Sequence, residues 1–243
     1  MKALVVGGSS GIGLSIVLQL VSRKHIEQVY VLDKQTFPNQ YSSDKICAVI
    51  HDLAKEPIEA TLSKLDSIQA LYITAGFGHL HYFQDFSAQY IQDSFSVNTI
   101  APIQIIRHYY NQLLGTAPFY CAVMVSIAGR LSSPMFSVYS ATKAALSKCI
   151  EAINIELEVQ NSNNRILEVS PGALKGTSFT GGKSDPNQTL SLADEIIMRA
   201  EQKETLFIPQ YDEVFKQVID RYQTDAHKYG IESYWYKQKR VKE

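Results

Sequence analysis

Near its N-terminus the chain reads Lys2-Ala3-Leu4-Val5-Val6-Gly7-Gly8-Ser9-Ser10-Gly11-Ile12-Gly13. The apolar run before the glycines is typical of a strand buried on both faces of a parallel sheet. The glycines then allow a tight turn in which the backbone can approach a pyrophosphate, and the following helix offers free N–H groups. The spacing is G-x-x-x-G-x-G, and such turns also form for packing alone. The segment therefore favours a dinucleotide site and leaves a purely structural turn as the alternative.

Short apolar runs and longer helical patterns alternate along the rest of the chain. Right-handed βαβ units have this pattern, which predicts an α/β fold with a parallel sheet between two helical layers, in one domain over residues 1–243. The predicted strands are Lys2–Val6, Gln28–Leu32, Ile46–Ile50, Ala70–Thr74, Tyr120–Ser126, Ile166–Val169 and Leu206–Ile208. The predicted helices are Gly11–Ser22, Ala88–Leu114, Ser137–Val159 and Asp212–Arg221.

Composition excludes several classes of protein. The 243 residues include 23 Lys or Arg and 24 Asp or Glu, and this balance argues against nucleic acid as a partner. No apolar run approaches the roughly 18 residues that span a bilayer, and glycines interrupt any signal-peptide core, so we expect no membrane partner. Cys47, Cys121 and Cys149 fit neither a disulfide framework nor a metal motif. We expect a cytoplasmic protein with reduced thiols and no metal.

The segment 172–188 breaks the alternation. It is rich in glycine and polar residues and has little apolar periodicity. A long irregular connection inside a compact domain is often a lid or a binding loop. The alternative is a plain surface loop.

Two acids follow predicted strands. Asp33 stands 20 residues after Gly13, the distance at which a carboxylate can accept hydrogen bonds from an adenosine ribose. Asp52 and Leu53 follow the third strand, where they could meet an adenine. Each acid also has a simpler reading, Asp33 as a loop residue and Asp52 as the cap of a helix starting near Pro57.

Tyr139 and Lys143 lie four residues apart at the start of a predicted helix and therefore share a face. An ammonium beside a phenol lowers the pKa of the phenol, which can then act as a general acid or base. The alternative is a solvated helix face. Ser126 ends the fifth predicted strand, where its hydroxyl would point into the ligand crevice or merely cap a turn.

Asn98 lies four residues before Pro102 in a predicted helix. Proline has no N–H, so the Asn98 carbonyl loses its usual donor and must find another partner. This is either a simple kink or an acceptor freed to reach Lys143 through water.

In combination these residues resemble the short-chain dehydrogenase/reductase family over about residues 2 to 210. The motifs that carry the resemblance are GGSSGIG, Asp33, Asp52, Asn98, Ser126, the YSATK run from Tyr139 to Lys143, and Pro171-Gly172, in the order and at about the spacing of the family. The resemblance implies a Rossmann-like, doubly wound parallel sheet of about seven strands. It also implies an oxidoreductase that interconverts an alcohol and a carbonyl with a nicotinamide cofactor.

The resemblance also implies residue roles. Tyr139 would exchange the proton, Lys143 would bind the nicotinamide ribose and lower the Tyr139 pKa, Ser126 would bind the substrate oxygen, and Asn98 would hold a water. The Gly172–Gln188 loop would fold over the substrate. The implied cofactor-binding residues are Gly7, Ser9, Ser10, Gly11, Ile12, Gly13, Asp33, Asp52, Leu53, Ala75, Gly76, Tyr139, Lys143, Pro171, Gly172 and Thr177.

Three departures from the family pattern stand out. Val6 replaces a threonine, Ile73-Thr74 replaces two asparagines before Ala75-Gly76, and Thr177 is displaced by one residue. Either Thr74 then does part of the work of the missing asparagines, or the packing differs there. The alternative function is a non-catalytic dinucleotide-binding protein on the same fold.

The expected cofactor is NAD(H), with NADP(H) as the alternative. A 2′-phosphate would lie close to the Asp33 carboxylate, and the glycine turn contains no Lys or Arg to offset the repulsion. The Lys34 ammonium could attract a 2′-phosphate, but on a flexible, solvated side chain its effect should be weaker than the repulsion by Asp33.

The apolar content of Ser137–Val159 exceeds what one face against a sheet requires, which predicts a homodimer or homotetramer. Tyr234, Trp235 and Tyr236 near the C-terminus predict a segment that closes over the pocket or docks on a neighbouring subunit, rather than a frayed tail. The basic residues beside them are predicted to form a solvated tip: Lys237, Lys239, Arg240 and Lys242. A largely apolar substrate pocket could be lined by Phe77, His79, His81, Tyr82, Phe83, Met135 and Phe136, and the alternative is that these side chains only pack the loops.

Overall fold

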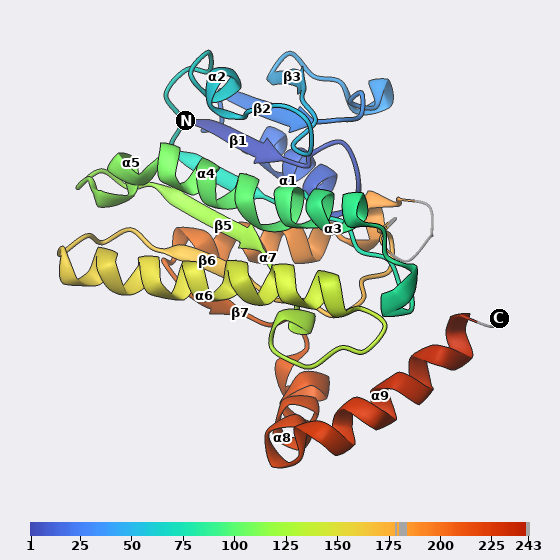
Figure 1. Cartoon of the computed structure of the whole chain (residues 1–243). Coiled ribbons are helices and arrows are strands. Elements are labelled where there is room, and N and C mark those ends of the chain that lie inside the picture. Colours follow the sequence, from blue (N-terminus) through green and yellow to red (C-terminus); the bar gives the residue numbers. More distant parts are fainter. Residues whose placement is uncertain (178, 180–183, 242–243) are drawn as a thin grey trace.

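The computed structural model describes residues 1–177, 179 and 184–241, with the side chains of the last two left out. At its centre lies a parallel sheet of seven strands in the order β3-β2-β1-β4-β5-β6-β7 (Figure 1). The strands are β1 (Lys2–Val6), β2 (Gln28–Asp33), β3 (Ile46–Ile50), β4 (Ala70–Ile73), β5 (Tyr120–Met124), β6 (Ile166–Val169) and β7 (Leu206–Phe207). The predicted Rossmann-like sheet is confirmed. The order reverses direction between β1 and β4, the point at which ligands bind in such sheets.

Alternate residues of each strand enter two separate cores. In β1, Ala3 and Val5 join one core, and Leu4 and Val6 join the other, all with no exposed surface. Because both faces are covered, the strands read as continuous apolar runs rather than alternating ones.

Helices cover the two faces. One face carries α1 (Gly11–Ser22) and α7 (Leu190–Glu201), and the other carries α4 (Ala101–His108), α5 (Tyr110–Leu114) and α6 (Ser137–Val159) (Figure 1). Smaller elements are α2 (Glu59–Leu62) and α3 (Ala88–Phe95), with short 3₁₀ turns at Asn39–Tyr41, Phe83–Asp85, Ile127–Gly129 and Pro186–Gln188. No helix among these described residues is long and apolar enough to cross a membrane.

Two predictions about helices need correction. The predicted helix Ala88–Leu114 is interrupted: a π-helical turn at Ser96–Ile100 separates α3 from α4, and Tyr109 separates α4 from α5. Pro102 is the second residue of α4, just after the π-helical turn, as expected where proline removes a backbone donor. Helix α7 was not predicted, although Ala193, Ile196, Ile197 and Ala200 are all buried at helical spacing.

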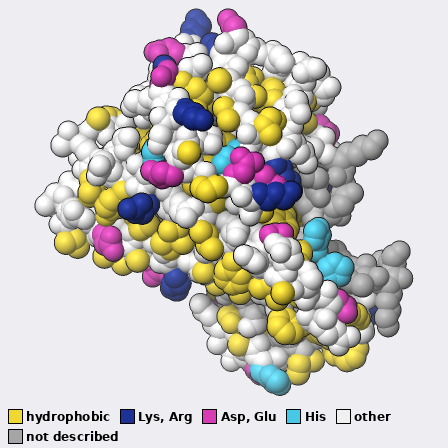
Figure 2. All heavy atoms as spheres, turned by 45° about the horizontal axis from the view of Figure 1, so that its top comes forward, with side chains coloured by type: hydrophobic (Ala, Val, Ile, Leu, Met, Phe, Trp, Pro, Cys, Tyr) yellow, Lys and Arg dark blue, Asp and Glu magenta, His cyan; other side chains and the backbone are white. Residues whose placement is uncertain are grey.

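The C-terminal part forms two helices that project from the body. A π-helical turn at Tyr211–Phe215 leads into α8 (Lys216–Thr224), and α9 (Ala226–Val241) follows (Figure 1). The space-filling view shows hydrophobic side chains on the lobe that these helices form at the lower right (Figure 2). On the single chain Trp235 and Tyr236 are 56% and 58% exposed, and docking of these two rings on a neighbouring subunit stays a prediction.

Candidate active site

The turn between β1 and α1 accepts only glycine at two positions. Gly7 has a φ of +85°, and a Cβ atom there would lie 2.5 Å from the Ala75 nitrogen. A Cβ on Gly13 would lie 2.1 Å from the Gly7 oxygen. The side chain of Ser10, at the start of α1, makes no capping hydrogen bond. The turn is therefore a tight backbone cradle at a helix N-terminus, which fits a phosphate group.

Thr74 supports this turn in place of the family's asparagine. Its Oγ1 lies 2.9 Å from the Val6 carbonyl oxygen and 3.1 Å from that of Gly7. The hydroxyl thus ties the end of β4 to the glycine turn, as the first of the two alternatives predicts.

Asp33 lies beside the same turn. Its Oδ2 accepts a hydrogen bond from the Ser9 N–H at 3.0 Å, and its Oδ1 accepts one from the Gln35 N–H at 3.0 Å. The carboxylate is therefore fixed at the end of β2, where a ribose bound along the sheet edge would reach it.

Asp52 and Leu53 have local partners. Asp52 Oδ1 accepts from the Ala54 N–H at 3.0 Å, and its backbone carbonyl accepts from the next turn. Leu53 packs against the core of its face. Asp52 thus organises the turn after β3 and does not cap α2, whose preceding residue is Ile58.

The Gly172–Gln188 loop reaches the glycine turn. The Gly11 N–H donates to Ser184 Oγ at 2.7 Å, and the Thr177 methyl group would lie 3.6 Å from a Cβ on Gly11. Thr177 therefore lies beside the glycine turn. Residues 178 and 180–183 of this loop, which include Gly181 and Gly182, lie outside the described residues.

Tyr139 stands at the start of α6, with 7% of its surface exposed. The Phe136 ring contacts its edge at 5.2 Å between centroids, and Phe179 lies 5.0 Å away on the loop. Burial raises the pKa of Tyr139 to about 12, and a hydrogen bond with the Ser126 side chain opposes that shift. The phenol is therefore protonated at neutral pH.

Lys143 lies one turn further along α6, with 2% of its surface exposed. Its Nζ donates to the Met124 carbonyl oxygen at 2.8 Å and lies 6.0 Å from the Tyr139 ring centroid. Burial lowers the pKa of Lys143 to about 7. The sequence predicted that a charged Lys143 would lower the Tyr139 pKa. In the structure burial moves both groups toward their neutral forms instead.

Asn98 is fully buried in the π-helical turn, and its carboxamide binds the backbone of Phe77 twice. Oδ1 accepts from the Phe77 N–H at 2.9 Å, and Nδ2 donates to the Phe77 carbonyl at 2.8 Å. Nδ2 also donates to Thr142 Oγ1 at 3.2 Å. The side chain thus joins α6 to the segment after β4. It holds Gly76 next to Lys143.

Ser126 lies on a turn held from two sides. Its Oγ accepts from the Ala128 N–H at 3.1 Å, and the Pro171 carbonyl accepts from the Ile127 N–H at 3.0 Å. Gly172 then passes close to a ring that sequence reasoning missed, because a Cβ there would lie 2.3 Å from Phe215 Cζ.

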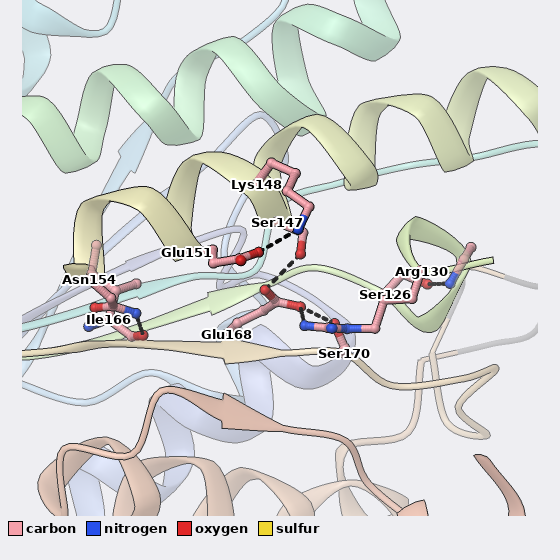
Figure 3. A network of polar contacts seen from close by, with 10 residues as sticks. Ser126, Arg130, Ser147, Lys148, Glu151, Asn154, Ile166, Glu168 and Ser170 are labelled. Carbon is pink, nitrogen blue, oxygen red and sulfur yellow. Dashed lines mark hydrogen bonds and ion pairs between the residues drawn. The ribbon is translucent and has the colours of Figure 1, made fainter. Parts of the chain in front are cut away.

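A buried carboxylate anchors this turn. Glu168 of β6, with 4% of its surface exposed, accepts from Arg130 at 2.5 Å, from Ser147 Oγ at 2.9 Å and from Ser170 Oγ at 2.7 Å (Figure 3). The Arg130–Glu168 pair therefore ties the segment after Ser126 to β6.

The predicted pocket residues are only partly assembled. Met135 is buried with a φ of +64°, and its carbonyl accepts from the His81 N–H at 3.0 Å. Phe83 is 70% exposed and faces solvent. Phe179 and Lys237 also join the rim. Sequence analysis missed Phe179, and its placement of Lys237 in a solvated tip is wrong, because the Lys237 Nζ binds Ser133 and Pro134. The contacts of Phe179 and Lys237 depend on tertiary structure, and the signals in the sequence were an aromatic residue in a polar loop and a lysine beside three aromatic residues.

Sequence relatives point to one family. A family model described as short chain dehydrogenase matches residues 1–188. The uncharacterized oxidoreductase TDA5 of Saccharomyces cerevisiae is 28% identical over 188 residues, which are 74% of this chain and 57% of that protein. The probable short-chain type dehydrogenase/reductase VdlC of Helicobacter pylori is 28% identical over 176 residues, 70% of this chain and 64% of that protein. The chain thus spans less than two thirds of the length of these curated relatives.

Solved structures share the fold. A short-chain dehydrogenase from Streptomyces avermitilis has a TM-score of 0.75 at 20% identity, covering 100% of this chain and 99% of that one. One from Burkholderia cenocepacia J2315 in complex with NADP has a TM-score of 0.72 at 19% identity, covering 93% and 94%. A 4-hydroxyisoleucine dehydrogenase complexed with NADH and succinate has a TM-score of 0.62 at 21% identity, covering 85% and 96%.

Proposed function

The chain belongs to the short-chain dehydrogenase family, and from this premise we propose that it interconverts an alcohol and a carbonyl compound by hydride exchange with a nicotinamide cofactor. One observation carries the proposal: the phenol of Tyr139, its Ser126 partner and the Lys143 ammonium group lie together at the sheet edge that also holds the glycine turn. A bound nicotinamide would supply or accept the hydride. The protein supplies position and the proton.

Tyr139 is proposed as the proton donor in carbonyl reduction. Its raised pKa keeps the phenol protonated at neutral pH, and Phe136 and Phe179 limit the access of water to it. Ser126 Oγ, whose hydrogen bond lowers the Tyr139 pKa against the effect of burial, would share the substrate oxygen. Lys143 has a pKa near 7, so a small change in its surroundings can change its charge. The charge of Lys143 in turn changes the pKa of the Tyr139 phenol.

The cofactor would lie along the edge of the sheet. Gly7, Gly11 and Gly13 form the phosphate end, where Ser184 Oγ at present accepts the Gly11 N–H and a phosphate oxygen would take its place. Asp33 would bind the ribose hydroxyls, and Ala75, Gly76, Pro171 and Gly172 would border the nicotinamide half. We propose NAD(H) over NADP(H), because a 2′-phosphate would lie beside the fixed Asp33 carboxylate.

We also propose a homo-oligomer in the cytoplasm. On α6, Ile155 and Val159 are 58% and 75% exposed, and a second copy would cover these apolar side chains. The cysteines Cys47, Cys121 and Cys149 are free thiols, which suits a reducing compartment.

The test begins with NADH fluorescence on addition of the protein and continues with its decay across a panel of aldehydes and ketones. We expect bound NADH to be oxidised by at least one carbonyl compound, and the Tyr139→Phe variant to bind NADH without oxidising it. Binding without oxidation of NADH or NADPH by any compound would favour the non-catalytic alternative.

A further inference from the structure

Helix α9 reaches back to the rim of the candidate active site. Gln238 Nε2 donates to the Tyr82 hydroxyl at 3.3 Å, and the Tyr82 and Tyr234 rings lie 6.5 Å apart. Tyr82 follows β4, so this contact joins the C-terminal helix to a loop at the carboxyl edge of the sheet. The family match ends at residue 188, so α9 is a feature of this chain outside the matched segment.

Lys237 makes the second contact of α9 with the rim. Its Nζ donates to Ser133 Oγ at 2.5 Å and to the Pro134 carbonyl oxygen at 3.1 Å, both on the loop before α6. The same Nζ lies 5.9 Å from the centroid of the Phe136 ring. Phe136 in turn contacts the Tyr139 ring at 5.2 Å. A single aromatic ring therefore separates the Lys237 ammonium from the proposed proton donor.

The ammonium of Lys237 lacks a counter-charge in the part of the chain that the structure describes. None of the ion pairs within 4.0 Å involves it, and its partners are a hydroxyl and a carbonyl. Burial lowers its pKa to about 8. A partly buried cation without a carboxylate is costly, and a bound anion would relieve that cost.

We propose that Lys237 binds a carboxylate at the far end of the substrate, which makes the substrate an oxo or hydroxy acid rather than a neutral ketone. This inference rests on the proposed function. One ammonium matches the single negative charge of a carboxylate, and the Ser133 hydroxyl beside it can donate a second hydrogen bond. The apolar side chains of Phe136 and Phe179 would accommodate the carbon chain between the carboxylate and the reacting carbon.

The first experiment measures binding and does not require turnover. Straight-chain carboxylates from butanoate to decanoate are titrated calorimetrically into the full chain with NAD⁺ present, beside the neutral amides of the same length. We expect at least one carboxylate to bind at least tenfold more tightly than its amide. Lys237→Met should abolish that preference and Lys237→Arg should keep most of it. Lys239→Met, on the exposed side of the same helix, is the matched control and should bind like wild type.

The second experiment compares 7-oxooctanoate with its methyl ester as substrates. We expect Lys237→Met to raise KM for the acid at least tenfold with kcat nearly unchanged, and to leave the ester unaffected. Equal binding of acids and amides by wild type, or an unchanged preference in Lys237→Met, overturns the inference. If alkyl phosphates bind in a Lys237-dependent manner and carboxylates do not, the assignment of a carboxylate is also overturned.

Failure of the proposed function would look different. Carboxylate binding that depends on Lys237, without NADH oxidation by any carbonyl compound, would overturn the function and support the site. NADH oxidation by neutral ketones, unaffected by substitution of Lys237, would support the function and overturn the carboxylate site.

Discussion

Asn98 and Lys143 converge on Gly76. A Cβ atom on Gly76 would lie 3.2 Å from Asn98 Oδ1 and 3.3 Å from Lys143 Nζ, so the missing side chain leaves room for both polar groups. Both groups are already held, Oδ1 by the Phe77 N–H and Nζ by the Met124 carbonyl. The Met124 carbonyl therefore holds the Lys143 ammonium in a position that only the absence of a side chain at Gly76, three residues after β4, leaves open.

Gly76→Ala should keep the fold but displace Lys143 by a few tenths of an ångström. We expect kcat to fall by about ten- to a hundredfold, because small misplacement of a catalytic group is costly. Steady-state kinetics measures this, with circular dichroism to confirm folding. Gly230→Ala is the control, since a Cβ there meets nothing within 4 Å. Unchanged kcat in Gly76→Ala would show that the Lys143 position is not critical.

Tyr139→Phe should reduce kcat by at least a hundredfold and leave the NADH dissociation constant within about twofold of wild type, because only a proton-transfer interaction is lost. Lys143→Ala should weaken NADH binding and lower kcat, since the Lys143 side chain is proposed to contribute to both. Stopped-flow kinetics and NADH fluorescence give the two quantities. Substantial turnover by Tyr139→Phe would contradict the assignment of the proton donor.

The buried Lys143 should make the free energy of unfolding depend on pH. Its pKa falls from the ordinary 10.5 to about 7 on folding, so between these values the unfolded state binds more protons and stability rises with pH. Between pH 7 and pH 9 the free energy of unfolding of the wild type should rise by on the order of 2 kcal/mol relative to that of Lys143→Met. Urea unfolding of both proteins at several pH values measures the difference. Parallel curves would show that the ammonium is not desolvated.

Glu168→Gln should destabilise the protein by about 1–3 kcal/mol, because it leaves the partly buried Arg130 without its counter-charge. Activity should fall as well, since Arg130 fixes the turn that carries Ser126. Glu151→Gln is the matched control: its ion pair with Lys148 is exposed (Figure 3), and its loss should cost less than about 1 kcal/mol. Equal effects of the two substitutions in thermal unfolding would contradict this prediction.

Asp33→Asn should shift cofactor preference toward NADPH by about tenfold, because it removes the charge that repels a 2′-phosphate while keeping one amide oxygen as an acceptor. Fluorescence titration with NADH and NADPH gives the four dissociation constants. Lys34→Gln is the control for the neighbouring charge. Tighter binding of NADPH than NADH by wild type would contradict the proposed preference.

The sequence predicted the strands well because strands buried on both faces have a simple signature. Three of them, Lys2–Val6, Ile46–Ile50 and Ile166–Val169, have the predicted bounds. The helix Ala88–Leu114 was harder, because apolar spacing continues across the π-helical turn and across Tyr109. Helix α7 was not predicted, because its short apolar face directly follows a long irregular loop without apolar periodicity.

For the candidate site, local spacing located the residues but not their electrostatics. The Tyr139–Lys143 spacing places both groups on one face, yet it carries no information on how deeply tertiary packing buries them, and burial decides the direction of both pKa shifts. Lys237 could not be assigned from the sequence, because its place beside Phe136 depends on how α9 returns to the loop before α6.

The order of the strands also constrains how the chain can fold during synthesis. Strand β1 is made first but lies between β2 and β4, and its second edge stays unpaired until residues 70–73 leave the ribosome. The glycine turn also cannot complete its packing before residues 74 and 75 are made, because Gly7 packs against Ala75 and Thr74. A nascent chain that stops before β4 exposes an apolar edge strand open to misassociation. Slow translation or premature termination in the first quarter of the chain should therefore call for chaperone protection.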